Sequence, residues 1–143
     1  MTAVLVWFVV EKEGAVLMGR RKAGQPPFEG AWTLPGDVML DDESTSETIE
    51  RFAKQQLDLH VIGDDFIDTL ELTNPSTSSG QAPGTEYDVN VFRALFTGEP
   101  RFRESGPFEE MGWASGAEIE DETMEMPERL RGLLQKVLKG SET

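Results

Sequence analysis

The sequence predicts an α/β (α+β) fold in which a mixed β-sheet packs between α-helices. Three observations predict this class: apolar, β-branched segments near the N-terminus, an amphipathic helix in the middle of the chain, and a second amphipathic helix at its end. Strands and helices in this order are typical of a sheet covered by helices. With 143 residues, the chain has the length of a single domain, which we expect to span residues 1–143.

The strands are predicted from short apolar runs bounded by turn residues. Lys12-Glu13-Gly14 supplies a turn between the first two runs, and Pro35-Gly36 ends the third. Apolar and polar residues alternate from 87 to 91, as in a strand with one buried face. Two segments are expected to be loops, the acidic Asp37–Glu43 and the Ser/Gly-rich Pro75–Gly84. The expected strands are Ala3–Val10, Ala15–Arg20, Trp32–Leu34, Phe66–Thr73 and Tyr87–Phe96.

Two helices are predicted from their end signals and their apolar faces. Ser44 is a candidate N-cap for a helix that continues to Leu57, and Glu47 three residues later completes a capping box. The second helix begins at Pro127, a residue favoured in the first turn, and ends at Gly140. Both segments carry apolar residues at helical spacing, so each helix is expected to bury one face.

The composition excludes several classes of function. The chain has 27 acidic and 13 basic residues and a formal net charge of −14, whereas a nucleic-acid partner requires basic residues for its phosphates. No cysteine is present, and the single histidine, His60, excludes a site built from several histidines. No apolar run approaches the ~20 residues of a membrane span. The N-terminal segment lacks the features of a signal peptide, so we expect a cytoplasmic protein without a membrane partner.

One segment carries a motif, GAWTLPGDVMLDDESTSETIERFAKQQLDL, from Gly30 to Leu59. It resembles the Nudix box of the MutT-like hydrolases, G-x5-E-x7-R-E-U-x-E-E-x-G-U, where U is aliphatic. Glu43 falls on the first box glutamate, Arg51 follows after seven residues as the box arginine, and Gly36 matches the first glycine of the family's Gly-Gly. The strand order around the motif also matches, so the resemblance implies a Nudix-like fold for nearly the whole chain.

The resemblance implies a reaction and a metal. Nudix hydrolases cleave a nucleoside diphosphate linked to another group, with Mg²⁺ or Mn²⁺ ions held largely by box carboxylates on one side of a helix. Those positions are Phe52, Gln55 and Gln56 here, and none of them is a carboxylate. The box predicts the fold strongly, but it predicts that the usual hydrolase activity is weak or lost.

The resemblance also assigns candidate site residues. The catalytic candidates are Glu43, Arg51 and Glu104, with Glu109 and Glu110 as alternatives to Glu104. A metal site rebuilt without the box carboxylates would use Gly36, Asp37, Glu43 and Glu104, unless no metal binds at all. The substrate-binding candidates are Arg20, Arg21, Arg93 and Phe52.

Each candidate has a structural alternative. Phe52 either stacks on a ligand or extends the apolar face of the helix, and packing is the commoner use of such a position. Asp37 and Glu104 are metal ligands or solvated loop acids, and Arg93 contacts a ligand or forms an internal ion pair. Only one of the adjacent Arg20 and Arg21 can face the site, because side chains alternate along a strand.

Two hypotheses for function follow. The first is a Nudix hydrolase with a nonstandard metal site, and the second is a non-catalytic module that binds a nucleotide-like ligand, another phosphorylated small molecule or a protein. A plain scaffold is a third reading. The resemblance is compatible with a homodimer, and the acidic surface with either salty surroundings or a basic partner.

Overall fold

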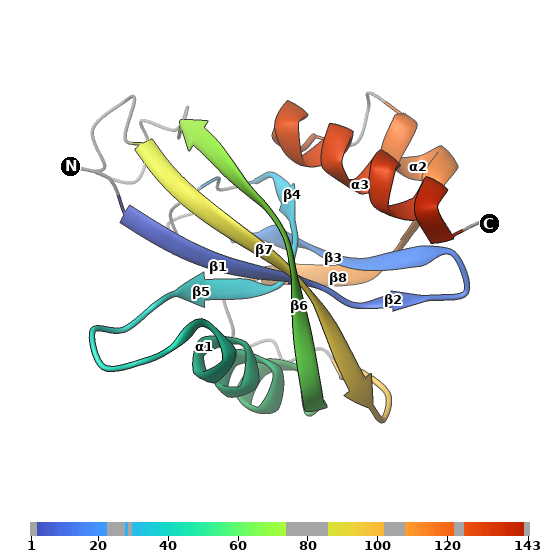
Figure 1. Ribbon diagram of the computed structural model, residues 1–143. Helices are drawn as coiled ribbons and strands as arrows, with labels where there is room; N and C mark the ends of the chain where they lie inside the picture. Colours follow the sequence, from blue (N-terminus) through green and yellow to red (C-terminus); the bar gives the residue numbers. More distant parts are fainter. Residues whose placement is uncertain are drawn as a thin grey trace.

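The computed structural model describes residues 3–22, 28, 30–73, 86–101, 108–121 and 125–141, which form a mixed α and β fold as the sequence predicts (Figure 1). The strands are β1 (Ala3–Val9), β2 (Glu11–Lys12), β3 (Ala15–Arg21), β4 (Trp32–Thr33), β5 (Gly36–Val38), β6 (His60–Thr73), β7 (Glu86–Thr97) and β8 (Phe108–Ser115). The helices are α1 (Thr45–Phe52), which continues as a π-helical segment (Ala53–Leu57), α2 (Gly116–Glu120) and α3 (Glu128–Ser141).

The strands form two sheets. In the first, the order is β5-β1-β7-β6, with β1 parallel to β7 and the other neighbours antiparallel, which makes it the mixed sheet that we expected. In the second, β3 is central: β2 and β4 pair with it, and so does β8. Helix α1 and helix α3 lie on opposite sides of this strand assembly in Figure 1.

The strand β1 separates two apolar cores. Its side chains alternate, so that Trp7 and Val9 enter one core together with residues of α3, whereas Val6 and Phe8 enter the other together with residues of α1. Both sets are almost fully buried, which explains why the segment is apolar without interruption. Burial on both faces fixes β1 and, through their pairing, β5 and β7.

The observed elements differ from the expected ones in several places, one of which is β2, where Lys12 lies in a strand rather than in the expected turn. The short β5 occupies the start of the segment expected to be an acidic loop, and β6 begins at His60 rather than at Phe66. Neither β8 nor α2 was expected, because the charged β8 lacks a β-branched run and α2 has only 5 residues. The predicted Pro75–Gly84 loop lies outside the described residues.

Candidate functional site

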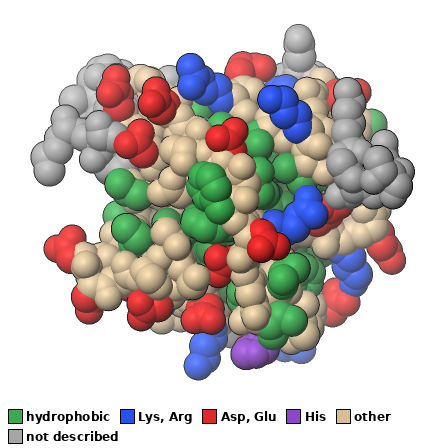
Figure 2. Space-filling view, viewed as in Figure 1, with side chains coloured by type: hydrophobic (Ala, Val, Ile, Leu, Met, Phe, Trp, Pro, Cys, Tyr) green, Lys and Arg blue, Asp and Glu red, His purple; other side chains and the backbone are tan. Residues whose placement is uncertain are grey.

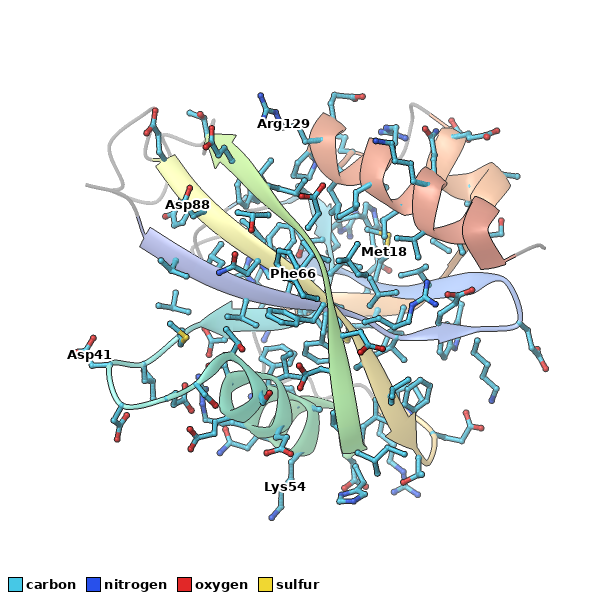
Figure 3. All side chains as sticks on the ribbon, viewed as in Figure 1. Met18, Asp41, Lys54, Phe66, Asp88 and Arg129 are labelled. Carbon is cyan, nitrogen blue, oxygen red and sulfur yellow. The ribbon has the colours of Figure 1, made fainter. Side chains whose placement is uncertain are left out.

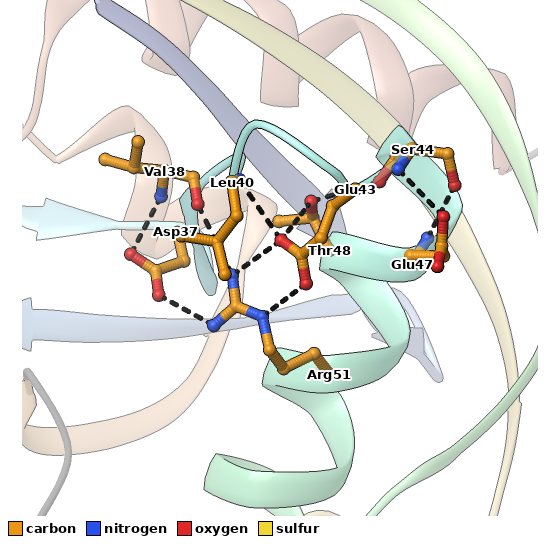
Figure 4. A network of polar contacts seen from close by, with 8 residues as sticks. All are labelled: Asp37, Val38, Leu40, Glu43, Ser44, Glu47, Thr48 and Arg51. Carbon is orange, nitrogen blue, oxygen red and sulfur yellow. Dashed lines mark hydrogen bonds and ion pairs between the residues drawn. The ribbon is translucent and has the colours of Figure 1, made fainter.

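The N-terminus of α1 is fixed by the predicted capping box. The Glu47 N–H donates to the Ser44 hydroxyl at 3.2 Å, and the Ser44 N–H donates to the Glu47 carboxylate at 3.0 Å (Figure 4). The Thr48 hydroxyl adds a bond to the Ser44 carbonyl at 3.1 Å. These contacts satisfy backbone groups that a helix start leaves without partners, so the helix begins at the same point at which the motif predicts it.

Arg51, in the last turn of α1, joins this helix to the preceding loop. Its Nε donates to Glu43 Oε2 at 2.7 Å, and its Nη2 donates to Glu43 Oε1 at 3.0 Å, which is a bidentate pair (Figure 4). Nη1 also reaches Asp37 Oδ2 at 3.2 Å, and Nη2 reaches the Val38 carbonyl at 3.3 Å. The planar guanidinium therefore braces the loop against the helix.

The charge on Glu43 is strongly stabilised. Its side chain is only 12% exposed, and hydrogen bonds from Arg51 lower its pKa to about 2, with further bonds from the Leu40 N–H and the Thr48 hydroxyl. The same pair raises the pKa of Arg51. A carboxylate whose oxygens already accept this many bonds has little capacity left for a metal or a proton.

The adjacent Gly36 and Asp37 lie on β5. Gly36 pairs with Trp7 and has a φ of 152°, and a Cβ there would lie 2.0 Å from the Val6 carbonyl oxygen. Only glycine fits this close approach. Asp37 accepts from the Val38 N–H at 2.7 Å and from Arg51, so its carboxylate is engaged on both oxygens.

The C-terminal half of the motif has different chemistry. Phe52 is only 3% exposed, and its ring meets Phe8 and Phe108 edge to face at centroid distances of 6.0 and 6.2 Å. Gln55 is exposed, and the buried Oε1 of Gln56 has no hydrogen-bond partner among the described residues. The structure thus places Phe52 where the packing interpretation expects it.

The π-helical segment ends at Asp58. The φ of this residue is 54° and its ψ is 36°, the left-handed conformation in which glycine is preferred after a helix. The box pattern has a glycine at this position. Asp58 therefore adopts the left-handed conformation, although the glycine of the motif would adopt it more readily.

The arginine candidates lie in three different environments. Arg20 pairs with Glu109 at 2.8 Å and with Glu110 at 3.1 Å, whereas Arg21 is 8% exposed and its guanidinium carbon lies 5.5 Å from the ring centre of Phe108. Arg21 therefore reaches the aromatic cluster that includes Phe52, and Arg20 does not. Arg93 lies 3.4 Å from Glu11, an internal ion pair of the kind that we considered.

Some site residues could not be placed or were missed. Glu104 lies outside the described residues, and its alternatives Glu109 and Glu110 are the ion-pair partners of Arg20. Sequence reasoning missed the contact of Asp37 with Arg51, although an acid next to a motif glycine was an available signal. It also missed the hydrogen bonds of the Thr48 hydroxyl to Glu43 and to the Ser44 carbonyl, although Thr48 follows Ser44 by four residues, about one helical turn.

A comparison with protein-family models decides the family. The model described as NUDIX domain matches residues 1–136. The chain belongs to the NUDIX family. The comparison with curated proteins found no match.

Solved NUDIX structures share the fold at low sequence identity. The MutT NUDIX hydrolase from Burkholderia pseudomallei is 22% identical, with a TM-score of 0.74 over 96% of this chain and 98% of that one. The MutT protein from Methanosarcina mazei Go1 is 19% identical, with a TM-score of 0.77 over 99% of this chain and 96% of that one. A bifunctional NMN adenylyltransferase/ADP ribose pyrophosphatase from Francisella tularensis is 20% identical, with a TM-score of 0.64 over 98% of this chain and 42% of that one.

NUDIX hydrolases generally use divalent metal ions. Within the described part of this NUDIX chain, no group of three or more His, Asp or Glu side chains is arranged so that it could hold one. Over the same residues, no helix is long and apolar enough to cross a membrane.

Proposed function

We propose that this NUDIX domain has weak or no metal-dependent hydrolase activity, and that it binds a nucleotide-like or other phosphorylated small molecule without a divalent metal. The proposal rests on the residues found on one side of the box helix, the side where the family has its metal-binding carboxylates. It holds a phenylalanine packed into the core and two glutamines. Mg²⁺ and Mn²⁺ prefer charged oxygen ligands, so this donor set does not fit either ion.

The remaining carboxylates do not compensate for the missing ones. Asp37 and Glu43 are both bound to Arg51, whose positive charge offsets one of their two negative charges. A cation placed between them would lie beside a guanidinium and would displace hydrogen bonds that hold the loop. This argues against a metal site rebuilt from Gly36, Asp37 and Glu43, and Glu104 alone would bring a single charge.

Basic side chains on β3 support the ligand part of the proposal. Arg21 approaches the Phe108 ring beside Phe52, so it brings a positive charge to the side of the molecule where the box helix packs. An arginine fork can hold phosphate oxygens directly. Arg21 is only 8% exposed and has partners of its own, and Arg20 and Arg93 are bound to carboxylates, so each of the three would have to exchange partners for a ligand.

The test combines metal titration with hydrolysis and ligand binding. Calorimetry with Mg²⁺ and with Mn²⁺ would use the native chain and the variant Q55E/Q56E, which avoids the buried Phe52. The variant K54E is the matched control, because it changes the net charge by the same amount on the same helix. We expect metal binding to be weak in the native chain and in K54E, and to strengthen about tenfold or more in Q55E/Q56E.

The ligand arm uses ADP-ribose as the probe, with and without EDTA. We expect binding that is unchanged by EDTA and weakened by R21Q, together with negligible cleavage. Metal-dependent cleavage by the native chain that is lost in D37N or E104Q would overturn the proposal, since the site would then have been rebuilt from those acids.

A further inference from the structure

A long strand edge lies outside the machinery described above. In the first sheet β6 is the last strand, paired with β7 on one side only, and it runs for 14 residues at the front of the molecule in Figure 1. Along the described residues no strand pairs with its outer side. Such an edge presents backbone N–H and C=O groups that can accept another extended chain.

Both faces of this edge expose large apolar side chains. On the α1 face Phe66 is 59% exposed and rests edge to face against Phe92, at a centroid distance of 5.5 Å (Figure 3). On the other face Ile62 and Leu95, which are 62% and 46% exposed, line a surface hollow of about 590 Å³. Because side chains of an added strand would alternate between the two faces, every second one would lie on the α1 face with Phe66 and the others on the face of Ile62 and Leu95.

The charge along the edge has one sign. β6 carries Asp64, Asp65, Asp68 and Glu71 and no lysine or arginine. Glu11 and Glu13 add acid at the hollow, where Arg93 is bound to Glu11. Figure 2 shows hydrophobic side chains on this side of the molecule between acidic ones. Phe66, Ile62 and Leu95 are therefore exposed at an edge whose own charged side chains are all acidic.

We propose that the outer edge of β6 is a docking site for an extended segment of a partner protein, in which basic side chains alternate with apolar ones. The backbone of the segment would pair with β6, its apolar side chains would cover Phe66 on the α1 face, and its basic side chains would meet Asp65 and Asp68 on the opposite face, where these acids pair in register with Arg93 and Val91 of β7. A second copy of the chain fits less well, because it brings the same acids to the edge and a formal charge of −14 to each molecule.

The probe is a labelled peptide of alternating lysine and valine, seven residues long, with blocked ends. Binding is measured by fluorescence anisotropy, and pairing is located by the hydrogen-exchange protection of the β6 amides. One comparison peptide replaces lysine by glutamate, and another is N-methylated on alternate residues, which removes the backbone donors on one side. We expect binding by the lysine peptide alone, with new protection confined to β6.

Matched variants separate the apolar and the charged contributions. We expect F66T to weaken binding about fivefold or more, whereas L40T removes another half-exposed apolar side chain elsewhere and leaves affinity within about twofold. We expect D65N/D68N to weaken binding about fivefold at low salt, whereas D41N/D42N makes the same charge change in the loop before α1 and has little effect.

Three results would overturn the proposal. The first is equal binding by the glutamate peptide or by the N-methylated peptide. The second is no binding of the lysine peptide up to millimolar concentration. The third is a native dimer in sedimentation experiments that F66T dissociates and L40T does not, because the occupant of the edge would then be a second copy. None of these depends on whether the domain hydrolyses or binds a nucleotide.

Discussion

The two halves of the box helix share one apolar core, but they differ in their polar contacts. The first half, from Ser44 to Arg51, is a dense polar network in which the helix start, the loop acid Glu43 and the arginine are joined by short hydrogen bonds. The second half, from Phe52 to Asp58, packs aromatic rings, leaves the Gln56 oxygen without a partner among the described residues, and ends in a left-handed residue.

This difference shows that the first half of the NUDIX motif helix, with its arginine and the preceding glutamate, is a structural unit by itself. No hydrogen bond of the Arg51 network involves the side chains at positions 52, 55 or 56. The arginine and the first glutamate therefore have a reason to stay in the sequence whatever stands at the metal positions. Four experiments can break or sharpen this comparison, in order of the size of the expected effect.

The largest effect is expected for Phe52 in the second half. F52A would remove a ring that packs against Phe8 and Phe108, and we expect it to lower the free energy of unfolding by about 3–5 kcal/mol. Urea denaturation measures the loss, with Q55A on the exposed side of the same segment as the control. A loss below about 1 kcal/mol would mean that Phe52 faces a space able to admit a ligand ring.

The next effect tests the first half. R51L leaves Glu43 and Asp37 without their cation in a partly buried place, and we expect a loss of about 2–3 kcal/mol, between the values for exposed and buried pairs.

A double-mutant cycle with E43Q isolates the pair. E43Q removes the charge that R51L leaves uncompensated. The double variant should therefore lose less stability than the sum of the two single losses. Strict additivity would show that Arg51 and Glu43 do not brace each other.

The pH dependence of stability sharpens the same point. The pKa of Glu43 falls from 4.5 to about 2 on folding, so its contribution is fully present above about pH 4.5 and is lost as the pH falls toward about 2. We expect the stability difference between the native chain and E43Q to shrink over this interval. A difference that stays constant from neutral pH downward would place Glu43 outside the network.

The start and the contacts of the first half of the helix could be predicted from the sequence, because these contacts join residues close together in the chain. Ser44, Glu47 and Arg51 act over one or two helical turns, where spacing determines which side chains meet. The uninterrupted apolar run of β1 likewise predicted a buried strand. The family resemblance then supplied the fold.

The remainder depends on contacts between distant segments. Phe52 meets Phe108 on β8, and Arg21 lies over the same ring, which no spacing along the chain reveals. The strand β8 escaped prediction because its pairing with β3, rather than β propensity, fixes it as a strand. The exposed edge of β6 was not predicted either, because strand order is a property of the assembled sheet.

The smallest effect is expected at Asp58, where the second half ends. Its φ of 54° costs a residue with a Cβ more than it costs glycine, although aspartate tolerates this conformation better than most residues do. We therefore expect D58G to stabilise the fold by at most about 1 kcal/mol and D58A to destabilise it by a similar amount. Thermal unfolding of D58G, D58N and D58A gives the order, with D42A in the preceding loop as the control for loss of an exposed acid. If D58A were as stable as D58G, the left-handed ending would not constrain this position, and the match of Asp58 to the motif glycine would carry no conformational meaning.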